Sequence, residues 1–233
     1  MSYHSTPQPA EQQWDRYGRT VAEATTEVRA GFIRAVYGLL SVSLIFAIAG
    51  AWLSATTDLK IWVVQNWILM LVLYIGTIVG AFLLRHTKPI NMLLMYGFTF
   101  VSGLWIGPVA YMYPGPALNA GVTTAAIFVG LSVYAHVSKR DFNFLGGFLF
   151  MGLIGVIIMI LVNLFILHSP AIAFGVSVVG VVIFCGFILY DTSNIMKRYP
   201  PNEYISATLS LYLDVLNLFW FLLRIFIQFA GDR

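Results

Sequence analysis

Seven long apolar runs recur along the chain, with only short polar breaks between them. A transmembrane helix needs roughly 20 mainly apolar residues, and a membrane-spanning strand only about half as many. Because hydrocarbon leaves unpaired backbone polar groups unsatisfied, runs of this length predict helices. The expected spans cover roughly residues 34–55, 62–84, 90–112, 117–138, 143–167, 170–195 and 204–229. This pattern predicts an all-α membrane protein with seven transmembrane helices.

The composition excludes several other classes of protein. Charged residues make up 10% of the 233 residues, against roughly 25% in soluble domains. The net charge of +3 is small and confined to loops and the N-terminal tail, which leaves no basic face for nucleic acid. The single cysteine, Cys185, excludes an intramolecular disulfide and predicts a packing role. Walker, zincin, nucleophile-elbow and dinucleotide motifs are missing, so we expect neither an enzyme nor a bound cofactor.

The sequence divides into a polar tail, residues 1–30, and a seven-helix domain, residues 31–233. The tail lacks the apolar core of a signal peptide. Basic residues gather on one side of the predicted spans, which by the positive-inside rule predicts a cytoplasmic N-terminus and a C-terminus outside. These residues are Arg16, Arg19, Arg29, Arg34, Arg85, Lys88, Lys139, Arg140, Lys197 and Arg198. We expect a multi-pass protein of the cell inner membrane.

Two acidic residues, Asp191 and Asp214, lie inside predicted spans. An ionisable group at that depth is costly unless it is paired or hydrated, so it indicates a function. The turn near Pro201 follows Asp191 by ten residues and precedes Asp214 by thirteen, which is about 15 and 20 Å along the two helices. Because the last two spans run antiparallel, the two carboxyl groups reach a similar depth and can meet.

Two adjacent carboxylates in a poorly hydrated place cannot both be ionised cheaply, so we expect this pair to hold one proton and titrate as a unit. The pair is therefore a candidate pH sensor. In its ionised form it is a candidate cation site, and oxygen ligands suit Ca²⁺ better than a transition metal. The alternative is that each aspartate separately pairs with a neighbour, for example Asp191 with Arg85 or Lys197.

Polar residues also repeat at helical spacing along the last span, with Phe221 as the one apolar member. The residues of this predicted polar seam are Ser206, Ser210, Asp214, Asn217, Arg224 and Gln228. Such a seam should not face lipid, so it predicts a central last helix that either lines a polar route or bonds to other helices. Arg85 ends the second span on the side of the aspartates. It is either a snorkelling anchor or the counter-charge that closes a gate.

Several segments resemble the transmembrane Bax inhibitor motif family. They are residues 188–195 with Asp191, residues 209–219 with Asp214, residues 102–108, and residues 138–142. The resemblance covers roughly residues 30–230. It implies seven helices with the last in the middle, and in bacterial members a pH-sensitive Ca²⁺ leak channel. In that picture Asp191 and Asp214 share a proton, and Arg85 is the latch on the pair. Some relatives carry a carboxylate in the second span, where this chain has none between Asp58 and Asp141.

A second function follows from a different branch of the same family. Residues 193–195 and 204–208 resemble bacterial members that modulate a membrane-bound quality-control protease. The expected partners are therefore the lipid bilayer, calcium ions and protons on the first hypothesis, and a membrane protease on the second. Nucleic acid is not expected on either.

Overall fold

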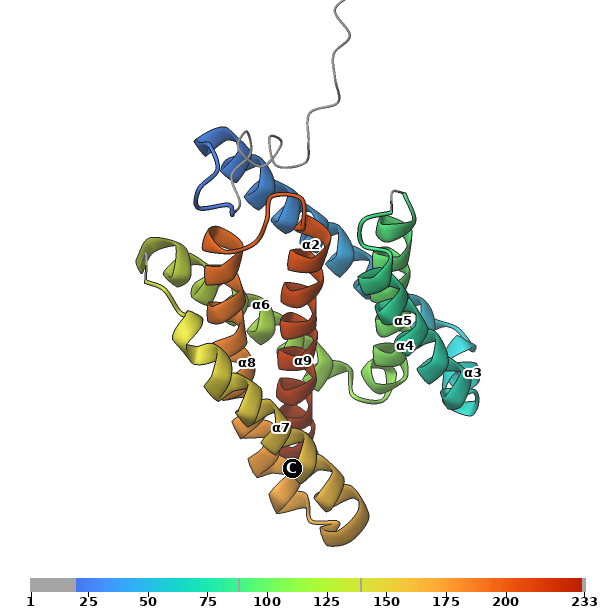
Figure 1. Ribbon diagram of the computed structural model, residues 1–233. Helices are drawn as coiled ribbons and strands as arrows, with labels where there is room; N and C mark the ends of the chain where they lie inside the picture. The colour runs from blue at the N-terminus through green and yellow to red at the C-terminus, as the bar shows by residue number, and fades with distance from the viewer. Residues whose placement is uncertain (1–19, 88, 139, 232–233) are drawn as a thin grey trace, which may run out of the picture.

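The computed structural model describes residues 20–87, 89–138 and 140–231, and the first nineteen residues of the predicted tail lie outside it. The described residues form helices and no strand (Figure 1). The helices are α2 (Thr26–Thr56), α3 (Leu59–Gln65), α4 (Trp67–Leu83), α5 (Ile90–Met112), α6 (Pro114–Ser138), α7 (Gly146–Val162), α8 (Pro170–Lys197) and α9 (Tyr204–Gly231). Short 3₁₀ and π turns, Asn143–Leu145 and Asn163–Leu167, flank α7. The predicted all-α membrane fold is confirmed.

Local side chains set the ends of the helices. The Thr25 hydroxyl accepts a hydrogen bond from the Val28 N–H, so α2 begins at Thr26 and residues 26–30 of the predicted tail are helical. Ser169 caps α8 in the same way and Pro170 follows as its first residue, as the sequence predicts. Two prolines then keep the segment between α8 and α9 out of the helix.

The prediction of one continuous helix over residues 62–84 is wrong. The segment forms two helices, α3 and α4, that meet at 89°. The break falls at Asn66, whose backbone N–H and side-chain Nδ2 both donate to the Trp62 carbonyl at 2.9 Å. Asparagine competes with the backbone for hydrogen bonds in this way, which ends helices without glycine or proline. Counting the bent pair as one span gives seven candidate spans.

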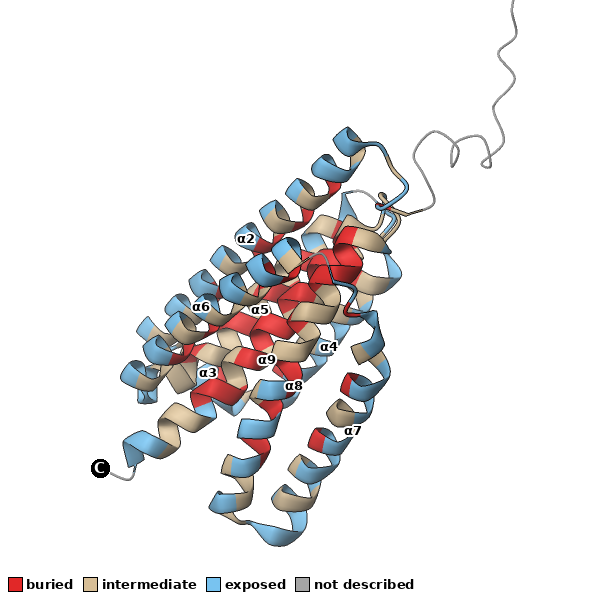
Figure 2. Cartoon of the chain, turned by 90° about the vertical axis from the view of Figure 1, so that its left-hand side faces the viewer, coloured by how far each residue is buried: buried red, intermediate tan, exposed pale blue. Residues whose placement is uncertain are grey.

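Helix α9 is the central helix of the bundle, as the polar seam predicts. It contacts α2, α5, α6 and α8, and Figure 2 shows buried residues along most of its length. Half of its most apolar window is buried, against 11–33% for the other long candidate spans. Side chains on α9 are therefore the ones best shielded from lipid.

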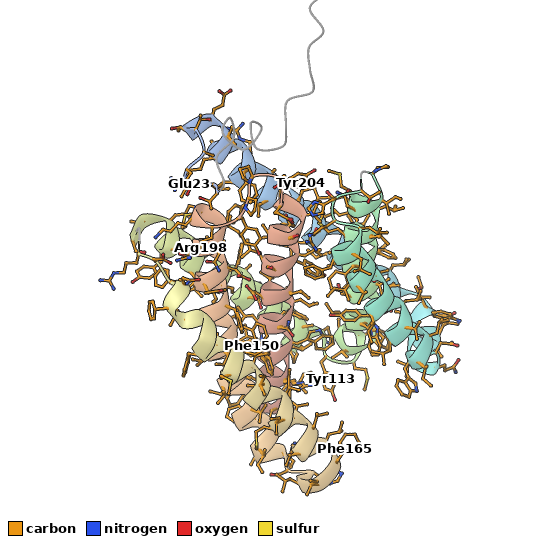
Figure 3. The ribbon with its side chains drawn as sticks, viewed as in Figure 1. Glu23, Tyr113, Phe150, Phe165, Arg198 and Tyr204 are labelled. Carbon is orange, nitrogen blue, oxygen red and sulfur yellow. The ribbon has the colours of Figure 1, made fainter. Side chains whose placement is uncertain are left out.

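The loops alternate between two ends of the bundle. Figure 3 shows Glu23, Arg198 and Tyr204 towards one end, with Tyr113 and Phe165 towards the other. The N-terminal end of α2 and the C-terminal end of α9 also lie at opposite ends (Figure 1). That arrangement requires an odd number of crossings, which agrees with seven spans.

Helices α2 and α5 form the closest backbone packing in the first half of the chain. A Cβ at Gly50, Gly103 or Gly107 would meet atoms of the facing helix, Phe100 O, Ala47 O and Ser54 Cβ respectively. Small residues allow this approach in membranes, where the hydrophobic effect does not drive helices together. This packing makes α2 and α5 one rigid unit beside the central α9.

Candidate functional site

The structure brings Asp191 on α8 and Asp214 on α9 together. Their carboxyl groups lie within side-chain hydrogen-bonding reach of each other, between two antiparallel helices joined by a short turn. Asp214 is 5% exposed, and it lies on the most buried helix of the bundle. The two carboxyl groups therefore lie close together, as the spacing of Asp191 and Asp214 from the turn predicts.

Two oxygen atoms at this site lack a hydrogen-bond donor. The Asn194 side chain, one turn after Asp191 on α8, hydrogen-bonds to the Asp191 carboxyl group. Asn194 Oδ1 is buried and has no hydrogen-bond partner. Asp214 Oδ2 is likewise buried without a partner. A site with unpartnered acceptor oxygens suits a proton or a hard cation.

Tyr199 lies next to the acid pair, in the turn between α8 and α9. Its hydroxyl is 3.2 Å from Ser210 Oγ on α9. Burial, and to a smaller extent the negative charges of Asp191 and Asp214, raise the pKa of Tyr199 from 10.0 to about 12. The phenol therefore stays protonated and acts as a hydrogen-bonding group beside the pair. Sequence reasoning missed it, because a tyrosine in a turn carries no periodic signal.

Arg85, the predicted latch, binds a different acid in this structure. Its Nε lies 3.3 Å from Glu203 Oε2. His86 Nε2 lies 3.2 Å from Glu203 Oε1, and the Ser206 hydroxyl donates to Glu203 Oε2 at 2.6 Å. We call this group of four residues the Glu203 cluster. It joins the end of α4 to the start of α9. The sequence analysis also missed Glu203, although an acid at the start of a span on the same side as Arg85 is a usable signal.

A further ion pair ties two loops together at the same end. Arg198 donates to Asp141 at 2.9 Å. The pKa of Asp141 is lowered, mainly by the hydrogen bond from the Asn143 backbone N–H and then by Arg198. Among the described residues, the ion pairs of Arg85, His86 and Arg198 thus all fall on Glu203 or Asp141 rather than on the buried pair.

The predicted polar seam of α9 divides into two parts. Ser206 bonds to Glu203, Ser210 lies beside Tyr199, and Asn217 Nδ2 donates to the Leu213 carbonyl at 2.8 Å. Phe221 then packs against Phe184 of α8 and interrupts the polar residues. Arg224, beyond it, is exposed. The polar stretch next to the acid pair therefore covers the first half of α9.

A hydrogen bond that the sequence did not predict connects α9 to α5. The Tyr212 hydroxyl bonds to Ser102 Oγ and also donates to the Thr99 carbonyl. Tyr212 is among the largest fully buried side chains. This bond couples the helix with Asp214 to the rigid α2–α5 unit.

The fold and this site define a class of protein, a multi-pass α-helical membrane protein whose last two helices bring together one half-buried and one buried carboxyl group. The chain belongs to the Bax inhibitor family. The family model described as "Inhibitor of apoptosis-promoting Bax1" matches residues 29–231.

Relatives occur in animals, fungi and bacteria. The chain is 36% identical over 213 residues to "Protein lifeguard 4" of Mus musculus, covering 89% of each chain. It is 34% identical over 226 residues to "Bax inhibitor 1" of Schizosaccharomyces pombe, covering 95% of this chain and 85% of the relative. An "Uncharacterized membrane protein" of Vibrio cholerae is 37% identical over 203 residues, covering 83% of this chain and 87% of the relative.

Proposed function

We propose that the protein is a pH-sensitive calcium leak channel, and that Asp191 and Asp214 form both its proton sensor and its cation site. The observation that carries the proposal is the close approach of two carboxyl groups, half-buried Asp191 and buried Asp214, the second of which keeps an oxygen without any donor. A buried acid without a donor is unfavourable as it stands, so a proton or a cation stabilises it.

The chemistry of this site makes protons and calcium compete. One proton shared between the carboxyl groups removes the repulsion between them. When the proton leaves, the pair carries two negative charges and its affinity for a hard cation rises, since metal ligands must be deprotonated. Asn194 Oδ1 adds a neutral oxygen of the kind that Ca²⁺ accepts. Calcium binding therefore strengthens as the pH rises through the titration of the pair.

The first half of α9 supplies polar groups on either side of Asp214. Ser206, Ser210 and Asn217 are each half-buried, and we propose that they line the route of the ion. Arg85 is the proposed gate latch at the cytoplasmic end, where it is held by Glu203.

The setting of the channel is part of the proposal. The distribution of basic residues supports a cytoplasmic N-terminus and a C-terminus outside. The cell inner membrane is the proposed location, and the bacterial relative agrees with it. The protein acts without an enzymatic step. A relative from Vaccinia virus is called "Golgi anti-apoptotic protein", and a calcium leak is one physical means by which a membrane protein of this fold could influence cell survival.

Calcium flux through the purified protein tests the proposal. The chain is reconstituted into liposomes that contain a calcium-sensitive dye, and the flux is recorded across a range of pH. We expect a flux that varies with pH and is lost in the double variant Asp191→Asn and Asp214→Asn. The exposed acid Asp58 gives a control, because Asp58→Asn should leave the pH profile unchanged.

Two results contradict the proposal. One is a double variant that keeps the flux and its pH dependence. The other is the absence of flux from the purified wild-type protein, which is the outcome expected of a non-conducting partner of a membrane-bound protease.

A further inference from the structure

A second buried polar group lies where α2, α6 and α8 come together, and it includes Thr192, the residue after Asp191. It consists of the hydroxyls of Tyr37, Ser132 and Thr192, which we call the hydroxyl triad. All three oxygen atoms are buried and have no hydrogen-bond partner. Thr192 is fully buried and Ser132 is 7% exposed. Three orphaned hydroxyls from three helices at one place are unusual, because buried polar groups are nearly always paired.

The three hydroxyls face one another. Ser132 and Thr192 both approach the Tyr37 hydroxyl closely enough to interact with it, but neither completes a direct hydrogen bond to it. The ring of Tyr37 is held by Phe128, at 6.4 Å between ring centres, and by His136, at 5.8 Å. The phenol is thus fixed in direction towards the other two groups.

Helical serines and threonines usually satisfy themselves by donating to a carbonyl one turn earlier. Several residues of this protein do so, including Ser177, whose hydroxyl donates to the Ala173 carbonyl at 2.8 Å on the same helix as Thr192. Ser132 and Thr192 do not use this option. Both hydroxyls lie near that of Tyr37 instead, and all three oxygens keep their hydrogen-bonding capacity for a further small polar molecule.

We propose that Tyr37, Ser132 and Thr192 form a binding site for a buried water molecule that joins α2, α6 and α8. A buried water typically makes about three hydrogen bonds to groups that are otherwise unsatisfied. The triad offers that number, and each hydroxyl can either donate or accept. The site is distinct from the acid pair and does not depend on calcium conduction. It brings water to the turn of α8 that follows Asp191, and to the side of the bundle where His136 is exposed.

The sign of a stability change tests the proposal. If water bridges the triad, Thr192→Val and Ser132→Ala each remove a hydrogen bond, and the Tm should fall by about 2–4 °C in each case. If the triad is dry, the same changes remove a buried group without a partner, and the Tm should rise. Ser177→Ala is the matched control, since it removes a buried hydroxyl bonded only within its own helix, and it should change the Tm little.

Direct labelling of bound water gives a second test on the unmodified protein. Radiolysis of water held next to a side chain attaches oxygen to that side chain, and ¹⁸O-labelled water identifies the source. We expect Tyr37 to be labelled, and Tyr212 to remain unlabelled because its hydroxyl is bonded to protein groups. A raised Tm in both triad variants, or equal labelling of Tyr37 and Tyr212, overturns the proposal.

Discussion

The α8–α9 hairpin carries acids in two settings, and they differ in how completely they are paired. At the end of the bundle, Glu203 receives Arg85, His86 and the Ser206 hydroxyl. Deeper in the bundle, Asp214 keeps one oxygen without any donor, and its neighbour Asp191 is another acid. An acid that is fully paired holds helices together and leaves no oxygen available for a proton or a cation. On the proposed function, the acid with an unpartnered oxygen is the one whose state changes with protons or cations.

This contrast predicts the largest effect for Asp214. We expect Asp214→Val to reduce calcium flux in liposomes by at least about tenfold, since a lost charged ligand is worth more than about 1.4 kcal/mol. The same change should raise the Tm in a thermal unfolding experiment, because removing a buried acceptor without a partner relieves a cost of about 1–3 kcal/mol. A variant that loses both flux and stability would mean that Asp214 is a structural residue like Glu203.

The next largest effect is expected for the stability of the folded protein at alkaline pH. The pKa of Tyr199 rises from 10.0 to about 12 in the folded protein. A raised folded-state pKa gives stability that is fully present below pH 10 and is lost as the pH rises towards 12. The free energy of unfolding, measured by chemical unfolding, should therefore fall between these pH values by up to about 2 kcal/mol less in Tyr199→Phe than in the wild type. Tyr113→Phe, at an exposed tyrosine, is the control and should leave the profile as it is.

A change at Asn194 separates its contribution to calcium binding from that of the two aspartates. We expect Asn194→Ala to weaken calcium binding by about threefold to tenfold, because one neutral oxygen ligand and one hydrogen bond to Asp191 are lost together, at about 1 kcal/mol. The pair still shares its proton, so the pH dependence of the flux should remain. Isothermal titration with Ca²⁺ measures the change. Unaltered affinity would restrict Asn194 to holding Asp191 in place.

The smallest effect is expected at the Glu203 cluster. Arg85 has 41% of its side chain exposed, so its pair with Glu203 is screened by solvent. A double-mutant cycle of Arg85→Gln and Glu203→Gln should give a coupling of about 0.5–1 kcal/mol. Calcium binding at the acid pair should stay within a factor of about two, equivalent to less than about 0.5 kcal/mol. A much larger change in binding would link the two regions, as a latch that reaches the pair requires.

The sequence predicted those parts of the structure that follow from regular patterns of residues along the chain. Long apolar runs and their breaks located the spans, because hydrocarbon admits almost no other backbone structure. The distance of Asp191 and Asp214 from the prolines predicted their contact, since the rise of a helix converts residue number directly into depth. The seam on the last span predicted the central position of α9, which half-buried and buried residues along that helix confirm.

The features that escaped prediction depend on one to three individual side chains and not on a repeated pattern. The bend at Asn66 comes from one amide that takes the Trp62 carbonyl, in a run whose apolar pattern is unbroken. Glu203 meets Arg85 across 118 positions of the chain, and the sequence signals only that both residues lie at span ends on the same side. The hydroxyl triad likewise forms from three helices and becomes visible only in space.

The proton shared by Asp191 and Asp214 is the claim on which the rest depends, and infrared difference spectroscopy measures it directly. The purified protein in lipid is titrated while the carbonyl stretch of protonated carboxyl groups is followed. We expect a protonated carboxyl band at neutral pH that disappears in Asp214→Asn and shifts when Ca²⁺ displaces the proton, with Glu203→Gln leaving it intact. A wild-type spectrum without that band, or one unaffected by the loss of Asp214, would contradict proton sharing.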